Sequence, residues 1–215
     1  MILGHFGLAL AAKRLAPRTS AGTTTAAAQL LDLVWPALVL VGVEQLRIEP
    51  GHMAASPMDF VHYPWTHSLA MSSLWGLVFG AIYFALRKGL RGAVVVGLLV
   101  TSHWVLDFLV HGPDLPVWPG GPKVGLGGWN SVAVTLLLEA TFFIGSLLVY
   151  TRATVAEDRV GRWGFWAYVV LLVVIYVSAV FGPVPAAPKA VAGGALVMWL
   201  LVPFAAWFDD HRAVR

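Results

Sequence analysis

Six long apolar segments dominate the 215-residue chain and limit what it can fold into. They cover approximately residues 25–46, 66–87, 91–112, 130–151, 163–182 and 189–208. A helix needs about 20 largely apolar residues to cross the hydrocarbon core of a bilayer, so each segment is long enough to span it. Charged residues make up only 12% of the chain, against 59% hydrophobic, which is too few to surround a soluble core. The sequence therefore predicts an all-α, polytopic integral membrane bundle of about six transmembrane helices.

A seventh apolar stretch, Ile2–Ala12, is too short to span a bilayer. It is followed by Lys13 and Arg14, whereas in a secretory signal the basic residues precede the apolar ones. We expect residues 1–20 to form a short interfacial or re-entrant helix. The chain is predicted to be a single transmembrane domain over 1–215. Residues 25–151 would form a bundle that carries a metal site, and 163–208 would add two further spans.

The basic residues predict the orientation of these spans. Eleven of the 14 Lys and Arg residues lie on one side of the predicted spans: Lys13, Arg14, Arg18, Arg87, Lys88, Arg91, Arg152, Arg159, Arg162, Arg212 and Arg215. The positive-inside rule places this side, and with it both termini, in the cytoplasm. The expected location is a bacterial cytoplasmic (inner) membrane, with the lipid bilayer as partner. A net charge of +3 is too small to indicate a nucleic-acid partner.

Histidines and acids supply the candidate metal ligands, since the chain has no cysteine. His62 and His67 lie in the segment HYPWTHS, at the entrance to the second predicted span. His103 and His111 lie in SHWVLDFLVHGPD, in the outer half of the third. Asp107 falls midway between His103 and His111, so the three share one stripe of a helix. A histidine and an aspartate one helical turn apart can bind one cation.

Two further acids, Asp32 and Glu139, fall inside predicted spans. Ionisable groups at this depth are costly unless they are paired, metal-bound or hydrated. No Lys or Arg lies in a span core, so the balancing charge must come from protons or from a metal. Pro36, shortly after Asp32, is expected to kink or open the first span.

Other polar residues have simpler interpretations. His111 and His62 are equally consistent with solvated histidines at the membrane interface, and Glu44 is expected to be a carboxylate at that rim. Asp209–Arg212 is expected to form a solvated tail. Gly193 and Gly194 are the expected point of close helix approach.

HYPWTHS followed by SHWVLD, with an early His5 and an acid at Asp32, resembles the membrane-bound metal-dependent hydrolase family. That family is distantly related to the zinc-dependent phospholipase C and single-strand nuclease superfamily. The resemblance covers roughly residues 1–120 and implies His5, Asp32, His67, His103 and Asp107 as ligands, with His62 at the first histidine of the family motif. This sequence departs from the family pattern in two places. Tyr63 stands where the family usually has Arg, and Leu33 stands where it often has a second acid, a role that Glu139 would fill.

The leading hypothesis is a membrane-embedded hydrolase that acts on a lipid or lipid-linked ester or phosphoester. Zn²⁺ is the preferred ion, with Mn²⁺ or Fe²⁺ as alternatives. Asp32 or Glu139, if not a ligand, would be the general base. Three alternatives remain open. They are an ion-coupled transporter that relays protons through buried acids, a haem protein with axial His67 and His103, and a non-catalytic membrane subunit.

Overall fold

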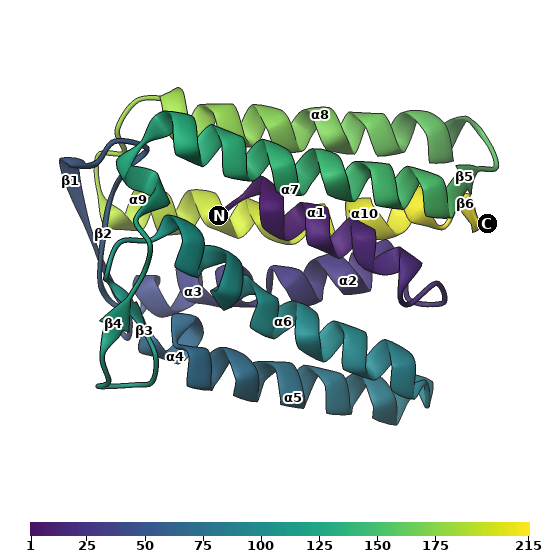
Figure 1. Ribbon diagram of the computed structural model, residues 1–215, viewed down its shortest axis with the longest axis horizontal. Coiled ribbons are helices and arrows are strands. Elements are labelled where there is room, and N and C mark those ends of the chain that lie inside the picture. Colours follow the sequence, from purple (N-terminus) through teal and green to yellow (C-terminus); the bar gives the residue numbers. More distant parts are fainter.

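The computed structural model describes all residues, 1–215, and 67% of them are helical. Figure 1 shows long helices that run side by side along the molecule. The α-helices are α1 (Leu3–Ala11), α2 (Ala21–Ala28), α3 (Leu30–Leu40), α4 (Pro64–His67), α5 (Leu69–Arg87), α6 (Leu90–Val110), α7 (Val132–Ala153), α8 (Arg159–Phe181), α9 (Pro188–Ala195) and α10 (Leu201–Asp209). Three 3₁₀ helices join them: η1 (Ala12–Arg14), η2 (Gly128–Asn130) and η3 (Leu196–Leu200).

Five helical segments are long and apolar enough to cross a membrane: α5, α6, α7, α8 and the run from α9 through η3 to α10. Helices α2 and α3 bend by 52° between them and give a sixth if the pair counts as one span. The bend lies at Gln29, which leaves helical geometry at ψ 3°. Helix α3 continues through Pro36, so of the two effects predicted for this proline, a kink or an opening of the helix, the opening does not occur.

Helices α5 and α6 approach each other closely through glycines. A Cβ added to Gly76 would lie 2.5 Å from the carbonyl oxygen of Gly97, so only glycine fits there. The prediction that Gly193 and Gly194 provide such a contact is wrong. A Cβ at either position would meet no atom within 4 Å.

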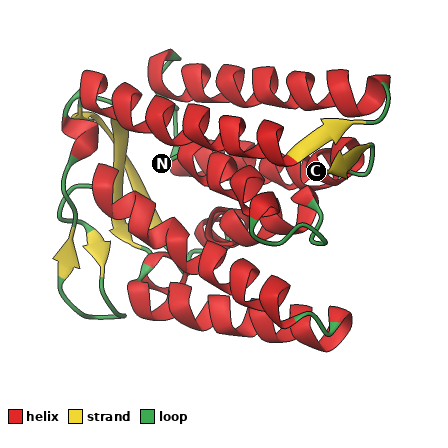
Figure 2. Cartoon of the chain, turned by 45° about the vertical axis from the view of Figure 1, so that its right-hand side comes forward, coloured by secondary structure: helices red, strands yellow, loops and turns green.

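Helix α1 lies inside the bundle between α7, α2 and α6 (Figure 1), and Figure 2 shows the N-terminus among the helices. Seven of its nine residues are buried. Gly7 permits this packing, since a Cβ there would lie 3.1 Å from Cβ of Ser146 on α7. Helix α1 is therefore a buried element and not a surface helix. Met1 is buried as well.

The end of the bundle near the C-terminus and the pair of strands β5 (Thr154–Ala156) and β6 (Arg212–Val214), here called the basic end, contains a buried ion pair. Lys13 Nζ lies 2.6 Å from Asp209 Oδ2, which also accepts a hydrogen bond from the N–H of Ala21 at the start of α2. The other oxygen of Asp209 accepts a hydrogen bond from the Tyr150 hydroxyl. The prediction of a solvated tail is thus wrong at Asp209, which joins the ends of α10, η1 and α2. Strands β5 and β6 pair antiparallel next to it.

Two hairpins cover the opposite end of the bundle, at the left of Figure 1. Strands β1 (Gln45–Met53) and β2 (Ser56–His62) pair antiparallel with Arg47 opposite Asp59. Strands β3 (Leu115–Pro116) and β4 (Lys123–Val124) form the smaller hairpin. A backbone hydrogen bond of 2.9 Å from Ala55 to Trp129 ties the first hairpin to η2. The polar cluster described next lies beneath this end.

Candidate metal centre

The carboxylate of Asp107, near the C-terminal end of α6, is the hub of a buried histidine cluster. Its Oδ2 lies 3.2 Å from His103 Nε2, 3.8 Å from His67 Nε2 and 4.0 Å from His111 Nε2. All four residues are almost completely buried. Three imidazole nitrogens from two helices therefore face one carboxylate oxygen.

His103 is oriented by the bend between α2 and α3. Its Nδ1 lies 2.8 Å from the carbonyl oxygen of Ala28, the last residue of α2. A carbonyl only accepts, so Nδ1 carries the proton and Nε2 keeps its lone pair. The Nε2 atom is buried and makes no hydrogen bond. This is the arrangement of a metal-binding histidine, whose other nitrogen donates to a backbone carbonyl.

His67 is oriented by Thr66 and Glu44. The Thr66 hydroxyl donates to Glu44 Oε2 at 2.7 Å, so its oxygen accepts from His67 Nδ1 at 2.7 Å. Glu44 Oε1 also accepts from the backbone N–H groups of Trp65 and Thr66, both at 2.9 Å. Glu44 was expected at the rim, but it is buried and supports His67. The only sequence signal for this role was an acid at the end of an apolar stretch.

His111 follows the same pattern at the end of α6. Its Nδ1 lies 3.1 Å from Asp114 Oδ1, which leaves Nε2 facing Asp107. The Tyr63 hydroxyl donates to the same Asp114 oxygen at 3.4 Å. Burial, and next the charge of Asp114, raise the pKa of Tyr63 well above its usual value, so the phenol stays protonated and donates. The Nε2 atoms of three imidazoles thus face the carboxylate of Asp107.

Asp32 on α3 forms a group of three candidate ligands with His67 and His103. Its Oδ1 lies 3.3 Å from His67 Nε2, and its Oδ2 lies 3.7 Å from His103 Nε2. Ligand atoms around one tetrahedral zinc lie about 3.3–3.5 Å apart, given bond lengths of about 2.0–2.1 Å. The separations among Asp32, His67, His103 and Asp107 are close to this spacing. The acids need positive charge between them and the imidazoles, which protons or a metal would supply, and imidazole nitrogens beside carboxylate oxygens are a donor set that fits a divalent metal.

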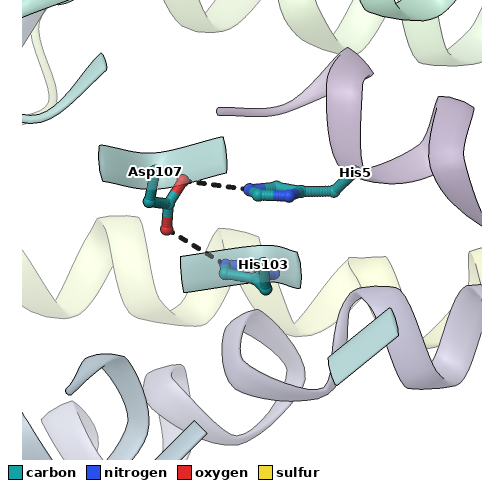
Figure 3. A group of neighbouring side chains, drawn as sticks. All are labelled: His5, His103 and Asp107. Carbon is teal, nitrogen blue, oxygen red and sulfur yellow. Dashed lines mark hydrogen bonds and ion pairs between the residues drawn. The ribbon is translucent and has the colours of Figure 1, made fainter. Parts of the chain in front are cut away.

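His5 reaches the cluster from α1, as Figure 3 shows. Its Nε2 lies 3.0 Å from Asp107 Oδ1, and its ring stacks on that of His103 with centroids 3.7 Å apart. His5, His103 and Asp107 form one group able to hold a metal ion, and Asp32, His67 and His103 form another. The Met1 amine contacts the same Asp107 oxygen at 2.5 Å.

Glu139 and His62 have other positions. Glu139 on α7 accepts hydrogen bonds from the backbone N–H of Ile2 at 2.7 Å and of Gly4 at 2.9 Å. Each of its oxygens therefore accepts an N–H at the N-terminus of α1, and the catalytic role expected for Glu139 stays a prediction. His62 is exposed at the end of β2, opposite Gln45, and belongs to neither histidine–acid group.

An apolar cavity of about 440 Å³ opens beside the cluster. Asp32, His67, Asp107 and His111 lie on its wall, and 14 of its 19 lining residues are hydrophobic. Helix α8 and the segment α9–η3–α10 supply the apolar side through Ile175, Ala179, Val191, Gly194, Ala195, Val197, Met198 and Leu201. The two C-terminal spans, which carry no motif, thus form the wall opposite the acids and histidines. No Lys or Arg lines this cavity.

Comparisons of the chain with family models, curated proteins and solved structures found no match. The site is therefore defined by its own geometry: two groups of three candidate ligands that share His103, next to an apolar cavity.

Proposed function

We propose that the protein is inserted in a bacterial inner membrane with its basic end in the cytoplasm. Two observations support insertion. The long helices expose large apolar side chains, such as Leu77 on α5 and Leu137 on α7, which are 72% and 67% exposed. The segments that carry the eleven basic residues also gather at one end of the bundle, through the β5–β6 pair and the contact of Lys13 with Asp209. The cluster around Asp107 then lies in the outer half of the membrane.

We further propose that the protein is a metal-dependent hydrolase of lipid or lipid-linked esters or phosphoesters. The observation that carries this proposal is that Asp32, His67 and Asp107 line an apolar cavity. His67, His103, Asp107 and Asp32 would hold one divalent ion, with Zn²⁺ preferred and Mn²⁺ or Fe²⁺ as alternatives. Bound there, such an ion would supply Lewis acidity toward a water molecule and the scissile group.

Asp32 is the group best placed to accept a proton from the attacking water. Its side chain is 26% exposed, whereas that of Asp107 is 3% exposed. It lies on the cavity wall, so a carboxylate oxygen that is not bound to metal can reach a water molecule there. Asp107 is held from both sides by His5 and His103 and is suited to ligation alone.

Trp35 would position the substrate. It lies three residues after Asp32 on α3, lines the same cavity, and its buried indole N–H has no hydrogen-bond partner. An unpaired buried donor is costly, and a carbonyl or phosphoryl oxygen of a substrate would satisfy it. The apolar wall from α8 to α10 would hold an acyl or isoprenoid chain and exclude water.

Metal analysis of the detergent-purified protein, followed by activity assays, tests this function. We expect about one tightly bound divalent ion per chain, by analogy with sites of three or four protein ligands. Release of fatty acid or phosphate from lipid substrates should stop when a chelator removes the ion and return when it is restored. Purified protein that contains no metal and binds none would overturn the proposal.

The bend at Gln29 favours a second candidate, an ion-coupled transporter. Broken helices near the middle of a membrane often form ion sites, and both side-chain amide atoms of Gln29 are buried without a partner. In this case substrate uptake into vesicles would depend on a proton gradient and persist without metal. The haem alternative has no support, because the His67 and His103 rings lie edge to face with centroids 5.2 Å apart and carboxylates at their nitrogens.

A further inference from the structure

A second cavity, here called the basic pocket, lies at the opposite end of the bundle. It has a volume of about 670 Å³ and is lined by Ala16–Thr19, by Tyr83 and by residues 87–92. These segments come from the connection between η1 and α2 and from the turn between α5 and α6. Four of the lining residues are cations, namely Arg18, Arg87, Lys88 and Arg91, and none is acidic.

The four cations are not neutralised by the protein. None of them takes part in an ion pair, whereas Lys13 at the same end is paired with Asp209. The acids of this end lie in the turns around the β5–β6 pair: Glu157, Asp158, Asp209 and Asp210. In Figure 1 that pair is at the upper right, and the α5–α6 turn is at the lower right. The cations of the basic pocket therefore have no acid in the pocket lining, whereas the arginines near the β5–β6 pair lie among acids in the sequence.

Two local features favour an anionic ligand in the basic pocket. Lys88 adopts a left-handed conformation, with φ 54°, at the end of α5. Glycine would fit this position without strain, so the lysine brings a charge at a cost in backbone energy. Thr19 Oγ1 and the Tyr83 hydroxyl lie 2.8 Å apart, and since only one of them donates to the other, one hydroxyl hydrogen stays free for a ligand.

Apolar grooves adjoin the basic pocket on the outside of the helices. One, of about 520 Å³, runs between α5 and α6 and shares Leu90 with the pocket. The other, of about 390 Å³, includes Arg14, Leu15, Val95 and Leu98. On α6, Arg91, Val95 and Leu98 follow one another at the spacing of one helix face. Charge at the end and apolar grooves further along match the headgroup and chains of a lipid.

We propose that the basic pocket binds the phosphate headgroup of an anionic diacyl phospholipid of the cytoplasmic leaflet, with the acyl chains in the adjoining grooves. This rests on the proposed membrane insertion but not on the metal site. Basic pockets near the cytoplasmic ends of transmembrane helices attract anionic lipids, and each cation near the surface raises the affinity about five-fold. Inorganic phosphate shares the headgroup chemistry but cannot use the grooves.

Native mass spectrometry of the purified protein in neutral detergent, titrated with phosphatidylglycerol or phosphatidylcholine, tests this proposal. We expect phosphatidylglycerol to bind preferentially. The double variant Arg87→Gln/Arg91→Gln should weaken this binding about 25-fold, at about five-fold for each cation removed. Lys88→Gly should weaken it about five-fold without lowering thermal stability, because glycine relieves the backbone at this position. If Lys88→Gly binds the lipid more weakly at unchanged thermal stability, the weaker binding is not caused by unfolding.

The matched control is Arg152→Gln/Arg159→Gln, which removes two exposed cations from the same end of the bundle but outside the basic pocket. It should bind phosphatidylglycerol as the unchanged protein does. Equal binding of the two lipids, or equal loss in the control, would overturn the proposal. Displacement of the lipid by inorganic phosphate at comparable concentration would instead identify a free-phosphate site and overturn the lipid assignment. Carbonate extraction of each variant from membranes tests insertion separately.

Discussion

The imidazole rings of His5 and His103 stack with their planes 6° apart, although His5 lies near the start of the sequence and His103 lies midway along it. This contact brings α1 into the same buried cluster as α6. Each ring turns an Nε2 atom to a different oxygen of Asp107. The carboxylate is therefore fixed from two sides before any ion binds, which predicts a preorganised metal site.

Removing a central ligand should remove the metal while the bundle still folds. We expect His103→Ala and Asp107→Ala to contain only background metal by elemental analysis, because His103 belongs to both candidate ligand groups and Asp107 to one of them. His62→Ala is the matched control, since His62 is exposed and outside the cluster. Normal metal content in both variants would contradict the assigned site.

Thr66 should matter through the imidazole that it orients. Thr66→Val keeps the shape but removes the hydroxyl that joins Glu44 to His67, so we expect metal affinity to fall about 10–100-fold. Thr66→Ser keeps the hydroxyl and should retain nearly full affinity. Chelator competition measures both. Equal affinities in the two variants would show that the hydroxyl does not orient His67.

Glu139 should affect stability more than chemistry. Glu139→Ala leaves the buried N–H groups of α1 without an acceptor, which costs about 1–3 kcal/mol for each unsatisfied group. We expect a lower thermal midpoint in detergent and a smaller loss for Glu139→Gln, which keeps one acceptor oxygen. If Glu139→Gln abolishes activity at unchanged stability and metal content, Glu139 acts as a base instead.

Trp35 should affect substrate binding without affecting the metal. Trp35→Phe keeps most of the apolar surface but removes the unpaired indole N–H. We expect full metal content and a catalytic efficiency lowered about ten-fold, the equivalent of one hydrogen bond of about 1–1.5 kcal/mol. An unchanged efficiency would show that the indole does not contact the substrate.

Asp158 should make the α7–α8 turn sensitive to acid. The N–H of Gly161 and next the imidazole of His211 hold the pKa of Asp158 below its usual value. Because the folded pKa is depressed, the stabilisation is present above about pH 4, the ordinary value for aspartate, and is lost as the pH falls through the lower folded pKa. The protection of backbone amides at the start of α8 against hydrogen exchange, relative to unprotected amides at the same pH, should fall over that range. Asp158→Asn should remove this pH dependence.

The amino-acid sequence predicted the helical class, the approximate span positions and four central residues: Asp32, His67, His103 and Asp107. These predictions were available because they rest on local patterns. Apolar length determines whether a helix can cross a bilayer, and one-turn spacing places His103 and Asp107 on one helix face. A charged group in an apolar segment is informative wherever it falls, because its burial must be compensated.

Only the tertiary structure decided how these residues are supported. Helix α1 is too short for its sequence to show whether it lies on the bundle or inside it, and Gly7 against Ser146 allows the inside position. Glu44 supports His67 through Thr66, which lies 22 residues further along the chain, Glu139 caps α1, and Asp209 pairs with Lys13 from the far end of the chain. Each contact joins donors and acceptors that are distant in sequence, so the pairing depends on how whole helices pack and not on any local pattern.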